Sequence, residues 1–320
     1  MEPPFHAGEL AVQERAGVAA AALRVGGIID AELHPRAAPF LAAQRLAVLG
    51  AADADGRMWA SALAGAPGFL RALDPHTLHA AAPLAIGDPL ADTLAAAGRD
   101  HARVDAGMLV IDLATRRRLR INGLAEPAAD GGVVIRVRQT YWNCPRYIQA
   151  RVAYPRASAG AEDGGGHGPR RAARLSDAQR AWIAAADTFF IATANPADGA
   201  DASHRGGDPG FIVSTRDGDG GDVLVFPDYP GNNMFNTLGN LAVNPAAGVL
   251  FIDFERGATL QLTGTAEVLW DHTDFAAFPG AGRAVRFRVA EAVELPRAVA
   301  PRWHLLELSP FNPPPPASPG

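Results

Sequence analysis

Residues 248–254 read GVLFIDF, and residues 107–113 read GMLVIDL. Each is a short run of branched and aromatic residues, which is typical of a buried β-strand. The segments that follow also match, because residues 122–126 (NGLAE) correspond to residues 263–267 (TGTAE). The offset is 141 residues in both cases (248 − 107 and 263 − 122). The chain therefore predicts two copies of the same pair of strands.

The repeat continues on the N-terminal side of these strands. Residues 67–70 (PGFL) match residues 209–212 (PGFI), and residues 40–43 (FLAA) resemble residues 182–185 (WIAA). Both pairs have an offset of 142 residues (209 − 67 and 182 − 40). Four matched blocks in the same order favour duplication of one unit over chance similarity between apolar segments.

The second copy predicts antiparallel strands with short helices. A capping box at Ser176 predicts a helix from Asp177 to about Ala186 that delivers Trp182 to the core. Strands are predicted at 188–193, 211–215, 222–226, 248–254 and 259–270, with hairpin turns at 217–221 and 255–258. Few turns and long strands favour a small closed or partly open barrel over a sandwich. We therefore predict a mainly β fold, a β-barrel with short helices in each copy.

Composition divides the chain into four parts. We predict an N-terminal barrel at residues 1–154, a linker at 155–174, a C-terminal barrel at 175–308 and a Pro-rich tail at 309–320. The linker has many Gly and charged residues and few large apolar ones. The tail reads as extended polyproline II and not as a folding unit.

Composition also excludes several functions. All 29 basic residues are Arg, so Schiff-base and P-loop lysine chemistry is excluded. Cys144 is the single Cys, which we expect to be a buried structural thiol, and we predict no metal site. The net charge of −5 gives no overall attraction to nucleic acid or anionic lipid. We expect a cytoplasmic protein with no nucleic-acid or membrane partner.

Two loops of the second copy hold polar residues that the first copy lacks. Residues 203–210 (SHRGGDPG) stand opposite residues 61–68 (SALAGAPG), and residues 228–240, which include Asn232 and Asn233, stand opposite an Ala-rich segment. An arginine beside two glycines can hold a phosphate while a flat ring approaches the backbone. Amides at the start of a helix add donors for an anion. This pattern predicts an anionic, planar ligand, although the same residues also suit plain turns.

These loops, with the strand 248–254, resemble the predicted flavin-nucleotide-binding branch of the pyridoxamine 5'-phosphate oxidase-like superfamily. Residues 141–149 (YWNCPRYIQ) are similar to the Cys-Pro segment that closes a barrel in that branch. The resemblance covers nearly all of residues 175–270 and, more weakly, 35–150. It implies two FMN-binding split barrels in tandem, which form an internal pseudo-dimer with one intact site in the second barrel.

The resemblance also implies which residues bind the cofactor. It places Ser203, Arg205, Asn232, Asn233 and Thr237 near the phosphate and ribityl chain of FMN, Gly206 and Gly207 near the isoalloxazine ring, and Asn143, Arg146 and Gln149 on the side of the first barrel. No catalytic side chain is implied, because the cofactor carries the reaction.

Two functions follow as hypotheses. The first is an FMN-dependent oxidoreductase that exchanges hydride with a small-molecule substrate or with NAD(P)H. The alternative is a haem-binding or non-catalytic flavin-binding split-barrel protein, with His204 as the candidate axial ligand. Trp303 is expected to pack the tail against a barrel, with cover of the ligand as its alternative role. The chain is expected to act as a monomeric pseudo-dimer or as a homodimer.

Overall fold

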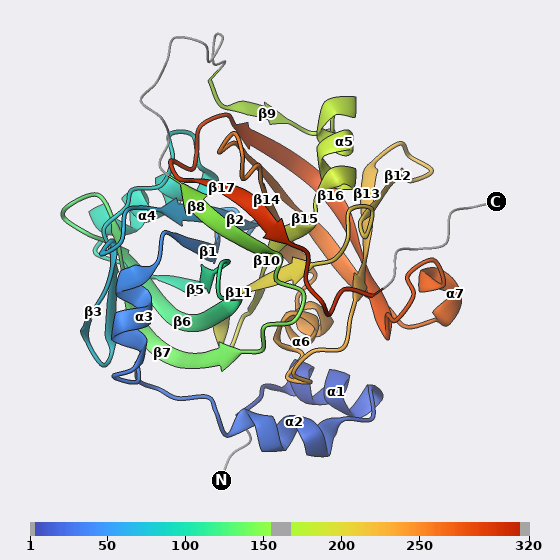
Figure 1. Ribbon diagram of the computed structural model, residues 1–320, viewed down its shortest axis with the longest axis horizontal. Coiled ribbons are helices and arrows are strands. Elements are labelled where there is room, and N and C mark those ends of the chain that lie inside the picture. Colours follow the sequence, from blue (N-terminus) through green and yellow to red (C-terminus); the bar gives the residue numbers. More distant parts are fainter. Residues whose placement is uncertain (1–3, 155–167, 314–320) are drawn as a thin grey trace.

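Seven strands of the N-terminal half form one antiparallel sheet in the computed structural model, which describes residues 4–154 and 168–313 (Figure 1). The strands are β1 (Leu46–Ala52), β2 (Met58–Ala64), β3 (Leu70–Asp74), β4 (Thr77–Ala80), β5 (Val104–Asp112), β6 (Arg117–Pro127) and β7 (Val133–Asn143). Their order across the sheet is β2-β1-β5-β6-β7-β4-β3.

The C-terminal half repeats this order. Its strands are β10 (Thr188–Asn195), β11 (Gly199–Gly206), β12 (Val213–Arg216), β13 (Asp222–Asp228), β14 (Ala246–Ile252), β15 (Thr259–Leu269) and β16 (Arg283–Leu295). They are arranged β11-β10-β14-β15-β16-β13-β12, so each strand of the first sheet has a counterpart numbered nine higher. The predicted hairpins β12–β13 and β14–β15 are both present.

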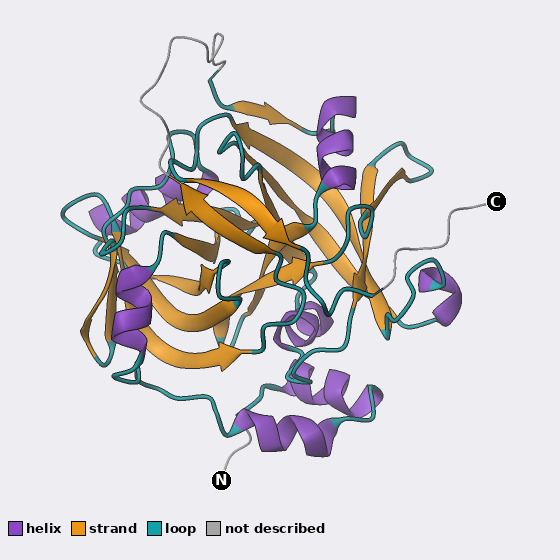
Figure 2. Ribbon diagram, viewed as in Figure 1, coloured by secondary structure: helices purple, strands orange, loops and turns teal. Residues whose placement is uncertain are grey.

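Short helices border the sheets (Figure 2), and seven of them lie within residues 4–154 and 168–313. They are α1 (Ala7–Arg15), α2 (Ala19–Gly26), α3 (Ala37–Ala43), α4 (Pro89–Arg99), α5 (Asp177–Ala185), α6 (Asn236–Val243) and α7 (His272–Phe275). The predicted capping box of α5 is confirmed, because Ser176 and Gln179 bond reciprocally. The helices α3 and α5 precede β1 and β10, and α4 and α6 precede β5 and β14. Helices α1 and α2 were not predicted from the sequence, and α1 packs against α6.

Each half has its own apolar core, and a third cluster joins the halves. This third cluster includes Val48 and Leu109 from one half and Phe190 and Leu250 from the other. Glycines let the backbones meet closely there. A Cβ on Gly248 would lie 2.6 Å from the Cα of Trp59, and Gly107 approaches Asp201 in the same way. These two contacts are related by offsets of 141 (248 − 107) and 142 (201 − 59), so the halves meet reciprocally.

The last strands of the two halves pair with each other. Strand β8 (Ala150–Tyr154) pairs with β17 (Arg302–Glu307), and the pair crosses in front of both sheets in Figure 1. Trp303 on β17 is 4% exposed and packs edge-on against Phe254, which confirms its packing role. No helix within residues 4–154 and 168–313 is long and apolar enough to cross a membrane.

Two segments differ from the sequence-based expectations. Residues 155–167 of the predicted linker lie outside the described residues, but residues 170–172 form strand β9 (Arg170–Ala172), which pairs with β16. Residues 314–320 of the predicted tail also lie outside the described residues. The tail is anchored before them, because Asn312 donates to Asp208 Oδ1 at 2.7 Å. Side-chain hydrogen bonds therefore fix the start of the tail.

Candidate functional site

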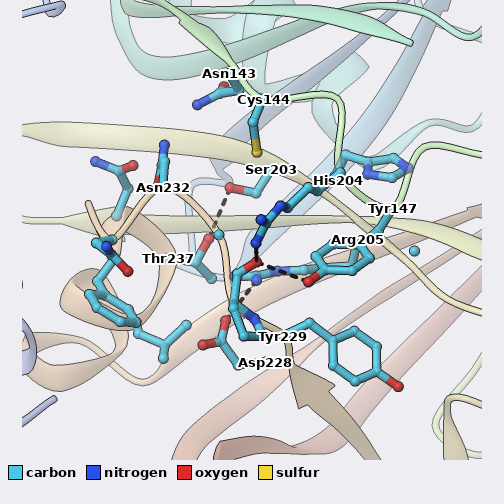
Figure 3. A pocket seen from close by; sticks show the side chains of 18 of the residues that line it. Asn143, Cys144, Tyr147, Ser203, His204, Arg205, Asp228, Tyr229, Asn232 and Thr237 are labelled. Atoms are coloured by element: carbon cyan, nitrogen blue, oxygen red, sulfur yellow. Dashed lines mark hydrogen bonds and ion pairs between the residues drawn. The ribbon is translucent and has the colours of Figure 1, made fainter. Parts of the chain in front are cut away.

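A cavity of about 310 Å³ lies where the two halves meet (Figure 3). Residues that follow β7 line one side of it, and the end of β11, the loop after β13 and the first turn of α6 line the other. Nine predicted site residues line this cavity: Asn143, Arg146, Ser203, His204, Arg205, Gly206, Asn232, Asn233 and Thr237. The folding of the chain thus brings together loops that are about 90 residues apart in sequence.

The other two predicted residues, Gly207 and Gln149, are not among the lining residues. Gln149 is fully buried, and its Nε2 donates to the carbonyl oxygens of Tyr147 and Gly207, both at 3.2 Å. Its Oε1 accepts from the backbone N–H of Ser309 at 2.6 Å. The Gln149 amide is therefore occupied within the protein and joins three segments behind the cavity. Its predicted contact with the cofactor stays a prediction, since Gln149 lies outside the residues that line the cavity.

A polar network from both halves forms the back of the cavity. Arg120 on β6 donates to Asp201 Oδ2 at 2.8 Å, to the Tyr141 hydroxyl at 2.9 Å and to Asn236 Oδ1 at 3.0 Å. It also donates to Ser203 Oγ, which accepts a second bond from the Thr237 hydroxyl at 2.9 Å. An arginine of the first half therefore fixes the side chains that the sequence identified in the second half.

Arg118 lies two residues before Arg120 and faces the same cavity. Its Nη1 donates to Nδ1 of His204 at 3.1 Å, and its Nη2 lies 3.9 Å from Cys144 Sγ. Burial lowers the pKa of Arg118 to about 10, so it stays charged at neutral pH. Sequence reasoning missed both arginines, although their spacing of two on a strand places them on one face.

His204 and Cys144 differ in exposure. His204 is 6% exposed, and burial lowers its pKa well below the ordinary value, with the nearby Arg118 as the next cause. Its Nε2 is buried without a hydrogen-bond partner. Cys144 was expected to be buried, but it is half-buried and lines the cavity. Pro145 follows Cys144 directly, and the chain turns there between β7 and β8.

Arg205 and Arg283 share one carboxylate at the other end of the cavity. Arg205 donates to Asp228 Oδ1 at 2.8 Å, and Arg283 Nε lies 3.1 Å from Asp228 Oδ2. At the mouth, Arg146 donates to the carbonyl oxygen of Pro230 at 3.1 Å. The cavity wall thus carries five arginines, and the carboxylates beside them are Asp228 and Asp201. The surplus is three positive charges in a chain whose net charge is −5.

The backbone around α6 is shaped for contact with a ligand. Phe235 precedes α6 with φ of 62° and makes no side-chain cap to the first turn. Tyr147 and Asn233, which also line the cavity, have φ of 66° and 63°. Such left-handed residues are uncommon outside glycine and cluster at functional sites. Asn232 was expected at the helix start, but the helix begins at Asn236, and Asn232 Oδ1 accepts instead from Met234 N at 3.1 Å.

The equivalent place in the first half is filled by the protein itself. Ser61 corresponds to Ser203 and Gln261 to Arg120, and Gln261 Nε2 lies 3.0 Å from Ser61 Oγ. Asp88 contacts both side chains, because it accepts from Ser61 at 2.6 Å and from Gln261 at 3.0 Å. It also caps α4 by accepting from Leu90 N at 2.9 Å. Helix α4 thus has its own anion at its first turn, whereas α6 has no side-chain cap.

Residues 175–307 match the family described as Pyridoxamine 5'-phosphate oxidase (PNPOx_N). This match confirms that the C-terminal half is similar to the pyridoxamine 5'-phosphate oxidase family, as the loop motifs indicated. No curated protein matches the chain.

Several solved structures are similar over part of the chain. A putative pyridoxamine 5'-phosphate oxidase from Lactobacillus delbrueckii is 16% identical, with 38% of this chain and 94% of that chain covered and a TM-score of 0.30. The FAD binding protein from Mycobacterium smegmatis is 15% identical (38% and 96% covered, TM-score 0.26). HutZ, the heme storage protein from Vibrio cholerae, is 12% identical (38% and 94% covered, TM-score 0.26). Likenesses this weak do not identify a ligand.

Proposed function

We propose that the cavity binds FMN and that the protein is an FMN-dependent oxidoreductase, which exchanges hydride with a small-molecule substrate or NAD(P)H. The observation that carries this proposal is the uncapped first turn of α6 beside Ser203, Thr237 and a surplus of arginine. In the first half a carboxylate, that of Asp88, stands at the corresponding place. The comparison of α4 with α6 therefore indicates that an anion binds at the first turn of α6.

The phosphate group fits the residues at this place. The first N–H groups of a helix and its dipole favour an anion, and hydroxyl groups add donors. Arg118 supplies a positive charge, because its contacts are His204 and Cys144 and not a carboxylate. Arg120 is already paired with Asp201, so its role is to position Ser203 and Asn236. Arginine and backbone donors thus replace the lysine that this chain lacks.

The remaining cavity fits a planar ring with polar edges. Buried polar atoms normally find a partner, yet Oδ1 of Asn143 and Nε of Arg205 have none within the described part of the chain. One is an acceptor and the other a donor, which suits a ring that carries both kinds of group. Gly206 lets the end of β11 approach the backbone of Tyr147, which lines the same cavity. FMN, when bound, supplies the hydride chemistry, and the residues of the chain orient it and set its charge environment.

We also propose that the two halves arose by duplication and form an internal pseudo-dimer with one cofactor site. The shared strand order and the reciprocal glycine contacts support it. The N-terminal barrel at 1–154 then supplies Arg118, Asn143 and Arg146 from the partner side, and the C-terminal barrel at 175–308 supplies the phosphate site. One chain contains all of this site, so further dimerisation is not required for it.

Haem binding is the second candidate, favoured by the unpartnered Nε2 of His204. The imidazole is enclosed, however, because Arg118 contacts its Nδ1 and Phe190 packs edge-on against the ring at 5.7 Å between centroids. Coordination of iron at Nε2 would therefore need these neighbours to move.

An absorption spectrum of the purified protein, with mass identification of the compound that heat releases, separates these candidates. We expect a two-band flavin spectrum and release of FMN, at one FMN per chain. A single intense Soret band that shifts in His204→Ala would replace the proposal with haem binding. A protein that stays colourless after FMN is added would refute both.

A further inference from the structure

A second cavity of about 220 Å³ lies behind the first, between α1, α6 and the start of β11. Asn236 lines both cavities. Its Oδ1 accepts from Arg120 at 3.0 Å, and its Nδ2 donates to Glu9 Oε1 at 2.5 Å. The second cavity is thus a separate space that shares one wall with the proposed FMN site.

The charge of the second cavity is opposite to that of the first. Three carboxylates line it, those of Glu9, Asp198 and Asp201, and no arginine does among the residues that the structure describes. Arg120 neutralises Asp201 from the far side. His6 also lines the cavity, but burial lowers its pKa, so it is neutral at pH 7. The cavity therefore keeps a negative charge.

Two buried acceptors in this wall have no partner. Asn122 is 9% exposed and Asp201 is 4% exposed, and the Asn122 side chain hydrogen-bonds to the Asp201 carboxylate. The Oδ1 atom of each side chain has no hydrogen-bond partner among the residues that the structure describes. Leaving a buried acceptor without a partner destabilises a protein, so such atoms indicate where a donor would bind. The acceptor of Asn240 is in use, since its Oδ1 lies 3.0 Å from His6 Nε2. The Oδ1 atoms of Asn122 and Asp201 can therefore accept from N–H donors, and the negative charge of the cavity favours donors that belong to a cation.

We propose that this cavity binds a small organic cation through an ammonium or guanidinium group. Asn122 Oδ1 and Asp201 Oδ1 accept its N–H groups at the back, and Asp198 neutralises its charge at the entrance. Glu9 completes the wall from α1. The site does not depend on the proposed FMN function, because it lies in a different cavity and its ligand is a cation.

Glu9 makes the binding depend on pH. Burial raises the pKa of Glu9 to about 7. The groups that face Glu9 are His6 from its own segment, Asn236 from α6, Asp201 from β11 and Arg120 from β6. A bound cation favours the ionised carboxylate, so affinity should rise between pH 6 and pH 8.

Isothermal titration calorimetry of the purified full chain tests the proposal, with methylguanidinium and methylammonium as probes and methylurea as the uncharged control. We expect one site per chain for at least one cation, no binding of methylurea, and a rise in affinity from pH 6 to pH 8. Asp198→Asn should weaken binding up to about fivefold, as loss of one exposed charge does, and Glu9→Gln, which removes a buried carboxylate, should weaken it at least as much. Asp92→Asn, on the surface of α4, is the matched control and should bind as the unchanged chain does.

Two results would overturn the proposal. One is the absence of binding by both cations at millimolar concentration, and the other is equal weakening in Asp92→Asn, which would show only general charge attraction. If Glu9→Gln lowers the melting temperature, Asp198→Asn alone decides, because its side chain is exposed and its contact is the Asn195 amide.

Discussion

Ser203 on β11 and Ser61 on β2 occupy equivalent positions in the two sheets, and each is hydrogen-bonded by a side chain from the opposite half. Arg120 contacts Ser203, and Gln261 lies 3.0 Å from Ser61. Asp88 fills the space beside Ser61, whereas the space beside Ser203 opens into the cavity. A single architecture thus gives a closed place that already holds a carboxylate in one half and an open, arginine-rich place in the other.

Removal of the Arg118 charge should weaken FMN binding. A charge-assisted hydrogen bond contributes about 1.5–3 kcal/mol, so Arg118→Ala should raise the Kd for FMN about 10- to 100-fold, measured by fluorescence titration. Arg205→Ala should have a smaller effect, because Asp228 already neutralises Arg205. Arg138→Ala, which removes a surface arginine paired with Asp105, is the control. Equal affinity in Arg118→Ala and Arg138→Ala would show that the phosphate lies elsewhere.

Ionisation of the buried Asp88 carboxyl should destabilise the fold as pH rises. Burial raises its pKa from 3.8 to about 6, so the native state holds this proton more tightly than the unfolded chain does. The contribution of Asp88 to stability is therefore greatest at low pH and is lost as pH rises from about 4 to 6, by about 3 kcal/mol. The difference in unfolding free energy between Asp88→Asn and the unchanged chain should shift in favour of Asp88→Asn over this range, measured by urea denaturation. A difference that is flat with pH would contradict this assignment.

His204 should give the opposite dependence of stability on pH. Burial, and then Arg118, lowers its pKa well below 6.5, so the folded protein keeps the imidazole neutral. Its contribution to stability is present above pH 6.5 and is lost as pH falls below that value, at up to about 1.4 kcal/mol per pH unit. His204→Gln should flatten the fall in unfolding free energy between pH 7.5 and 5.5. His272→Gln, on the exposed helix α7, should leave the fall unchanged, and an unchanged fall in both variants would count against the role of His204.

Local patterns predicted much of the fold. The alternation of Leu260 and Leu262 with Gln261 predicted β15, and the capping box of Ser176 predicted α5. These features depend on neighbouring residues only. Gln261 could be placed on the opposite face of the strand, but not in its contact with Asp88, which lies 173 residues away.

The parts that sequence reasoning missed depend on distant contacts. Helix α1 is held by the packing of Gly8 against the backbone of Gly239, more than 200 residues away. Arg118 and Arg120 reach the site only because the two halves dock face to face. The family resemblance of residues 141–149 implied that Gln149 contacts the cofactor. In the structure its amide instead forms hydrogen bonds with the backbone of Ser309 and Gly207. No local pattern specifies such partners.

Gly206 should be required for the docking of the halves at the cavity. A Cβ at Gly206 would overlap the carbonyl oxygen of Tyr147, a backbone atom that cannot move without displacing the segment after β7. Gly206→Ala should therefore destabilise the protein by about 1–3 kcal/mol and weaken FMN binding. Gly218→Ala is the matched control, because a Cβ there meets no atom within 4 Å and its φ is not in the left-handed region. Urea denaturation and FMN titration of both variants check this, and equal behaviour of the two would show that the Tyr147 segment adjusts freely and does not define the cavity.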